Sequence, residues 1–214
     1  MTAEATRPID RSKLVFFSLA AAALTAALWA DDRFLFNPGD PHWKHIEPFK
    51  WVLLPHGVFG AIALFSGASQ FSDRLRQSRP MVHRWLGRAY LTAVTIAAPL
   101  AVWIGAGPFQ PATIRVEQWF QGGLWWLCAA IALVCILRRR VELHKRWMMR
   151  SYGFTLVFVT ARVPDLFIPQ MSDQMLSDLL WGLVVIALFA PDLALSVRDL
   201  WRTRASARPM QRAA

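Results

Sequence analysis

The sequence predicts an all-α protein that crosses a membrane several times. Of its 214 residues, 55% are hydrophobic and only 18% are charged, and the mean hydropathy is +0.31. The charges fall in short intervals between long uncharged runs, a pattern typical of polytopic membrane proteins. Each run is close to the roughly 20 residues that a helix needs to cross a bilayer. We therefore expect one bundle of six transmembrane helices over residues 13–198.

The N-terminal part of the chain is expected to form a tail, a helix and a loop. Residues 1–12 are polar and are interpreted as a cytoplasmic tail. Residues 13–30 form an apolar run with a charged start, as in a signal peptide, but Leu28 stands where a cleavage site needs a small residue. We expect this first helix to be retained. Residues 31–50 contain three prolines and mixed charges, which indicates a loop on the outer side.

Five further apolar runs predict the remaining helices. The run at 51–71 carries His56 near its outer end. The run at 80–105 contains Pro99, where we expect a kink. The other three helices are expected at 117–137, 142–167 and 178–198, followed by a basic cytoplasmic tail at 199–214.

Positive charges predict the orientation of these helices. The alternate intervals 1–13, 74–88, 138–150 and 198–214 hold 19 of the 24 Lys and Arg residues. Cytoplasmic segments of membrane proteins are enriched in these residues, so both termini are expected in the cytoplasm. The same rule accounts for the net charge of +10. The expected partners are therefore membrane lipids, and nucleic acid is not expected.

Two histidines lie near the cytoplasmic starts of the third and fifth predicted helices. If these helices are neighbours, the imidazoles of His83 and His144 can face each other across the space of a flat macrocycle. Bis-histidine haem requires this arrangement, so both are candidate ligands of a haem b iron. Four more residues are candidate haem-binding groups: Gly87, whose missing side chain would let a porphyrin lie against the backbone, and Arg84, Arg88 and Arg150, which could pair with propionates.

A second interpretation of these residues stays open. Histidines and arginines at the end of a membrane helix are ordinary interfacial residues whose side chains reach lipid phosphates. The cations are also required by the predicted orientation. The positions of the two histidines alone therefore do not decide between haem ligation and contact with lipid.

A second polar cluster is expected at the outer ends of the helices. Arg162 lies 18 residues after His144, so both fall on one stripe of the fifth helix. An arginine this deep in an apolar run must face the bundle interior and find a partner. His56 has no histidine opposite it on the fourth helix. The cluster is interpreted either as a structural ion pair or as a polar pocket for a quinone or another small ligand, and it comprises His56, Gln121 and Arg162 with Glu117 and Asp165 as candidate acidic partners.

Two blocks of sequence, 60–90 and 144–152, together with Arg162, resemble the conserved blocks of the bacterial membrane proteins catalogued as domain of unknown function 2306. The resemblance covers roughly residues 53–189 and implies a multi-pass protein of the bacterial inner membrane. The helical layout of that family is similar to that of the ascorbate-reducible transmembrane cytochromes b, in which histidines on alternate helices hold haem. The resemblance implies His83 and His144 as ligands of one haem, whereas His56 lacks the mate that a second haem needs.

These residues favour one function and leave a second open. The first is a haem b electron-transfer protein of cytochrome b-like type, an oxidoreductase component that exchanges electrons with a quinone or a redox partner protein. The second is a haem-free membrane protein that acts as a transporter, as a lipid-binding or small-ligand-binding protein, or as an accessory subunit of a larger membrane complex. The predicted spans do not contain the residue pattern of a hydrolytic triad.

Overall fold

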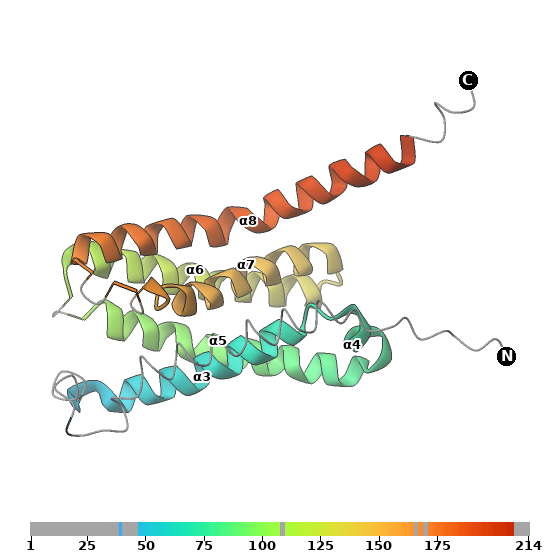
Figure 1. The fold of residues 1–214 in the computed structure, drawn as a ribbon. Helices are drawn as coiled ribbons and strands as arrows, with labels where there is room; N and C mark the ends of the chain where they lie inside the picture. The colour runs from blue at the N-terminus through green and yellow to red at the C-terminus, as the bar shows by residue number, and fades with distance from the viewer. Residues whose placement is uncertain (1–38, 40–46, 108–109, 165–166, 169–170, 208–214) are drawn as a thin grey trace.

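The computed structural model describes residues 39, 47–107, 110–164, 167–168 and 171–207 (Figure 1). Within these residues the chain forms α-helices and one short 3-10 helix, and no strand, which confirms the predicted all-α class. The predicted tail at 1–12, the first helix at 13–30 and most of the loop at 31–50 lie outside the described residues. The elements are η2 (Glu47–Phe49), α3 (Lys50–Ser69), α4 (Asp73–Ser78), α5 (Pro80–Gly105), α6 (Ala112–Leu137), α7 (Val141–Thr160) and α8 (Asp173–Ala207).

Four of the described helices are long and apolar enough to cross a membrane: α3, α5, α6 and the Asp173–Val197 part of α8. Large apolar side chains cover their outer faces, among them Trp103 and Phe189 at 58% and 66% exposure. Soluble monomers rarely expose apolar patches of this extent. α7 is not among the four, and the described residues therefore contain four candidate spans where the sequence predicted five. The first half of α7 carries the charged residues Glu142, Lys145, Arg146 and Arg150.

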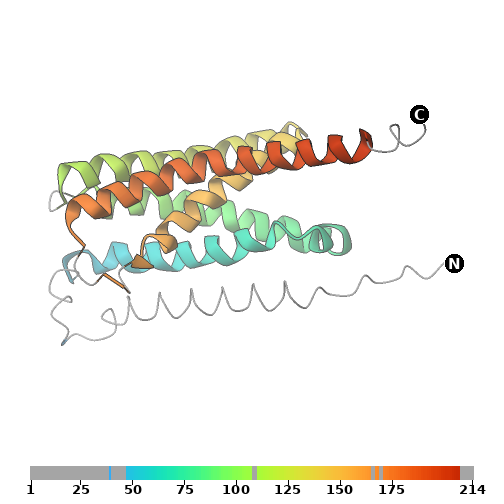
Figure 2. The same cartoon turned by 45° about the horizontal axis from the view of Figure 1, so that its top comes forward.

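The helices form a ring of four with α8 packed against its side (Figure 1). α3 packs on α5, α5 on α6, α6 on α7, and α7 on α3, while α8 contacts α7 and α6. Successive helices run in opposite directions, and α7 crosses obliquely from α3 toward α6 and α8 (Figure 2). α5 and α7 therefore face each other across the ring. We name the end with α4 and the starts of α5 and α7 the His83 end, and the end with the starts of α3, α6 and α8 the His56 end.

Small residues let the four helices of the ring approach closely. Ala97 of α5 and Ala132 of α6 are both fully buried in the core. Close backbone approach at alanine and glycine is a main source of helix packing in membranes. At Gly67 of α3, a Cβ would lie 2.6 Å from the ring of Tyr152 and 2.8 Å from the ring of Tyr90. The glycine therefore makes room for two tyrosines in the ring.

Several helix ends differ from the predicted ones because local chemistry decides them. α5 has the predicted bounds and continues through Pro99. α7 ends at Thr160 rather than at 167, because Pro164 lacks the N–H that a helix needs and disfavours helical backbone in the residue before it. α8 begins at Asp173 rather than at 178, because the Ser172 hydroxyl accepts a hydrogen bond at 3.3 Å from a backbone N–H in its first turn.

Two further features of the connections were not predicted. The short helix α4 lies between α3 and α5, and its N-cap Ser72 accepts a hydrogen bond from the N–H of Leu75 at 3.2 Å. α6 begins at Ala112, directly after Pro111, rather than at 117. Proline is well suited to the start of a helix because its missing N–H would have no partner there.

Candidate functional site

The two histidines singled out by the sequence lie at the same end of the bundle. His83 is in the first turn of α5 and His144 is in the first turn of α7. The turn that precedes α7 is tight: Arg139 has a φ of 59°, and the N–H of Arg140 bonds to the carbonyl of Cys135 at 2.9 Å, as in a Schellman motif. The His83 ring interacts electrostatically with the His144 ring. The fold thus brings the two imidazoles within range of each other.

A buried polar contact two turns farther along both helices defines how α5 and α7 are rotated. Tyr90 follows His83 by seven residues, and Ser151 follows His144 by seven. Seven residues are nearly two turns at 3.6 residues per turn, so each lies on the same helix face as its histidine. Tyr90 and Ser151 are both 0% exposed, and their hydroxyls are hydrogen-bonded at 2.7 Å. The histidine-bearing faces of α5 and α7 consequently point toward each other across the ring.

This contact belongs to a polar layer that joins three helices. The Tyr90 hydroxyl is also 3.1 Å from the hydroxyl of Thr155 on α7. Trp125 of α6 donates a hydrogen bond from Nε1 to the same Thr155 hydroxyl at 3.1 Å. Each buried polar group in this layer therefore has a partner, as groups in an apolar environment require.

His144 is held in the tautomer that metal ligation requires. Its Nδ1 lies 2.8 Å from the carbonyl oxygen of Ala132 on α6. A carbonyl oxygen can only accept, so Nδ1 carries the proton. In the neutral ring Nε2 then keeps its lone pair, and within the described parts of the chain it has no hydrogen-bond partner. Metal-bound histidines commonly donate their other ring N–H to a carbonyl, which orients the ring.

His83 presents a buried nitrogen that lacks a partner. Its Nδ1 forms no hydrogen bond with any residue that the structure describes, and such an atom costs about 1–3 kcal/mol. Gln70, which follows α3, donates a hydrogen bond to the backbone oxygen of His83 at 3.2 Å. A Cβ at Gly87 would lie 3.1 Å from Oε1 of the same glutamine. Gly87 therefore makes room for Gln70, and the backbone beside it is covered.

Two of the arginines predicted near the histidines lie on the exposed face of α5. Arg84 donates from Nε to the carbonyl of Pro80 at 3.3 Å. The Arg88 guanidinium lies 5.0 Å from the centroid of the Trp85 ring, and both side chains are exposed. Neither arginine points into the ring of helices.

Arg150, the third predicted arginine, connects α7 to α8. It forms an ion pair with Asp192, and its guanidinium lies 4.5 Å from the centroid of the Trp147 ring. Its side chain is only 17% exposed. Arg150 is therefore already paired, and the three arginines are not gathered around the histidines.

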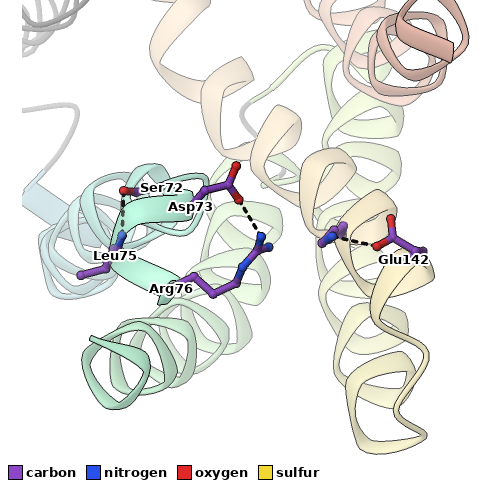
Figure 3. A network of polar contacts seen from close by, with 6 residues as sticks. Ser72, Asp73, Leu75, Arg76 and Glu142 are labelled. Carbon is purple, nitrogen blue, oxygen red and sulfur yellow. Dashed lines mark hydrogen bonds and ion pairs between the residues drawn. The ribbon is translucent and has the colours of Figure 1, made fainter. Parts of the chain in front are cut away.

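A cation that the sequence did not single out lies at the His83 end. Arg76 of α4 interacts electrostatically with the His83 ring and forms an ion pair with Asp73 at 2.7 Å. Figure 3 shows this pair near the start of α7, where Glu142 is paired with Lys145 at 2.7 Å. α4 thus adds a charged group to the end of the bundle that holds the histidine pair.

The His56 end contains a second group of polar side chains. His56 is 2% exposed, and its Nδ1 lies 3.1 Å from the carbonyl oxygen of Ala97 on α5. Its ring meets the ring of Phe158 edge-on at 4.9 Å. The Arg162 guanidinium lies 4.7 Å from the centroid of the same phenylalanine ring. His56 and Arg162 both line a cavity of about 330 Å³ between α3, α6 and α7.

Glu117 is not an ion-pair partner of Arg162 in this structure. It is 0% exposed, and its Oε2 accepts a hydrogen bond from Gln118 at 3.0 Å. Its Oε1 has no partner among the residues that the structure describes. Gln121, one turn farther along α6, is 8% exposed. Asp165, the other predicted acidic partner, lies outside the described residues.

Two further observations complete the survey of sites. A groove of about 800 Å³ between α5 and α6 is apolar, with walls that include Trp103, Trp119 and Trp126, and contains none of the predicted site residues. In the described ranges, no three His, Cys, Asp or Glu side chains cluster as they would to hold a metal ion with protein ligands alone.

The sequence reasoning missed Tyr90, Trp125 and Asp192. A signal for Tyr90 was present, because it follows His83 at the same seven-residue spacing with which Ser151 follows His144. Trp125 and Asp192 had no such signal. Their roles depend on which helices are neighbours, and an apolar run does not encode that.

Comparison with known proteins identifies a family. The family model described as "Predicted membrane protein (DUF2306)" matches residues 53–196, more than half of the chain. No curated protein and no solved structure matches the chain. The matched region contains both histidines of the His83 end, the polar layer and the cavity at the His56 end. This chain therefore belongs to the DUF2306 family of predicted membrane proteins, with apolar helices in contact with lipid.

Proposed function

We propose that this protein binds one haem b between His83 and His144 and serves as a membrane electron-transfer protein. The observation that carries the proposal is the 2.7 Å hydrogen bond between Tyr90 and Ser151. Because these residues share helix faces with the histidines, the contact orients both imidazoles toward the centre of the ring. Helix bundles hold cofactors between side chains of facing helices.

The chemistry of the two rings supports this assignment. The hydrogen bond from His144 Nδ1 to the Ala132 carbonyl leaves Nε2 as the free lone pair of the neutral ring. His83 has a buried nitrogen without a partner, and ligation through this ring would offset the cost of its burial. Haem, when bound by two histidines, supplies a one-electron ferric and ferrous couple. Arg76, rather than Arg150, is the cation that supports propionate binding.

The proposal includes a six-helix topology in a bacterial inner membrane, with both termini in the cytoplasm. α7 has 20 residues, and a helix of that length spans about 30 Å. It lies inside the bundle, beside α3, α6 and α8, which supports a fifth crossing. Reporter fusions placed after each helix test this topology. A reporter fused at the C-terminus that is active only outside the cytoplasm would contradict it.

Absorbance spectroscopy of the purified protein tests haem binding. The protein should be expressed in haem-replete cells, purified in mild detergent, and measured before and after reduction by dithionite. We expect a Soret band, sharpened visible bands on reduction, and one haem b per chain by the pyridine haemochrome method. A folded, colourless preparation overturns the proposal and favours a haem-free ligand-binding or accessory membrane protein.

A further inference from the structure

The cavity at the His56 end has features of a ligand site. Its volume of about 330 Å³ falls at the lower end of the range for small-molecule sites, about 300–1,000 Å³. Aromatic side chains, Trp125 and Phe158, contribute to its walls, and its polar side chains include His56, Thr155 and Arg162. A mostly apolar cavity with a few polar groups is the usual composition of a site for a small organic molecule.

The polar groups define the chemistry of the ligand. An arginine can only donate hydrogen bonds, so Arg162 favours a ligand with oxygen acceptors. The Ala97 carbonyl accepts from Nδ1 of His56, so in the neutral ring Nε2 of His56 is an acceptor, suited to a ligand hydroxyl. Phe158 lies against both side chains. A flat ring that carries carbonyl or hydroxyl oxygens satisfies all of these groups.

The α3 side of the cavity indicates that the ligand is soluble in lipid. Gly57, Gly60 and Ala61 line this side, and a Cβ at either glycine would meet nothing within 4 Å. Gly57 and Ala61 lie on the exposed face of α3, which is an apolar membrane span. A ligand that reaches the cavity past these small residues comes from the membrane interior rather than from water.

We propose that this cavity binds the ring of a lipid-soluble quinone or quinol. Thr155 and Trp125 line the cavity and also belong to the polar layer around Tyr90, so the ligand and the histidine pair contact the same layer from opposite sides. The role of the quinone as a redox partner rests on the proposed haem function. The binding of the quinone rests on the cavity alone.

The test is equilibrium binding of decylubiquinone to the purified full chain in nanodiscs. Gly60→Leu places a side chain in the cavity without a clash in the protein, and we expect it to weaken binding at least tenfold. Gly182→Leu is the matched control, because Gly182 is also open, lies in a membrane span and does not line the cavity. We expect this control to bind like the wild type. Decylbenzene, which lacks the ring oxygens, should not compete.

The results separate this inference from the proposed function. Equal binding by Gly60→Leu and wild type, competition by decylbenzene, or no saturable binding overturns the quinone site, whether or not haem is present. Binding that is lost in Gly60→Leu but retained in Gly182→Leu supports the site even in a colourless protein. In that case the haem proposal fails and the quinone site stands. Thermal unfolding of both leucine variants verifies that each is folded.

Discussion

The Tyr90 hydroxyl lies 2.7 Å from the Ser151 hydroxyl across the ring formed by α3, α5, α6 and α7. Both residues are completely buried, and each lies about 10 Å along its helix from the histidine on the same face. This single contact therefore determines how the helices that carry His83 and His144 are rotated. A rotation of either helix by one residue, about 100°, would turn its histidine away from the ring.

A double-mutant cycle tests the Tyr90 contact. We expect Tyr90→Phe and Ser151→Ala each to destabilise the protein, with a coupling energy of about 0.6 kcal/mol and at most about 1.7 kcal/mol, the range found for hydrogen bonds inside membranes. The measurement is the free energy of unfolding in detergent for the wild type, the two single variants and the double variant. Strictly additive effects would show that the two hydroxyls do not meet.

Gly67→Ala should destabilise the bundle. The added methyl group would lie within 2.8 Å of two tyrosine rings, so α3 must move away or the rings must turn. Overpacking of this kind costs about 1–3 kcal/mol. The control is Gly60→Ala, where the new methyl group meets nothing within 4 Å, and its melting temperature should stay close to that of the wild type. Equal melting temperatures for both variants would contradict the close packing of α3 on the tyrosines.

Arg150→Gln should lower stability without changing the haem content. The residue pairs with Asp192 of α8, so the variant removes a link between α7 and α8. We expect a loss of about 1 kcal/mol, or about 2–4 °C in melting temperature, since the pair is partly exposed. The measurement is thermal unfolding combined with haem quantification. Loss of haem at unchanged stability would instead restore the propionate role that the sequence suggested.

Replacement of Glu117 by methionine should stabilise the protein. One carboxyl oxygen of this buried residue has no partner among the described residues, and removal of such a group relieves about 1–3 kcal/mol. Gln118→Met is the control with the opposite expected sign, because it removes the one hydrogen bond that the Glu117 carboxyl accepts. Chemical unfolding of both variants gives the two signs. A destabilised Glu117→Met would mean that the carboxyl has a partner in the membrane.

The apolar runs predicted most of the helices because membrane helices are apolar whatever their neighbours. The bounds of α5 agreed with the prediction, since polar residues and a tolerated Pro80 mark its start. The end of α7 was wrong because its apolar run continues beyond Thr160, and Pro164, which limits the helix, was given too little weight. The early start of α8 depends on a cap by Ser172, a local signal that hydropathy alone does not contain.

The candidate site could be predicted only in part. The sequence located His83 and His144 at one end of the bundle because both follow short basic segments. It could not assign partners to the arginines, since Arg150 and Asp192 are 42 residues apart and meet only because α7 packs on α8. Nor could it show that Gly87 faces Gln70, because that contact depends on the path of the chain between α3 and α5.

The most direct test of the central claim compares the reduced spectra of three histidine variants with that of the wild type. His83→Ala and His144→Ala should each lose the low-spin haem b spectrum that two imidazole ligands produce. His56→Ala should retain it, because His56 lies at the other end of the bundle. An unchanged spectrum in either of the first two variants, or a loss confined to His56→Ala, would contradict the account.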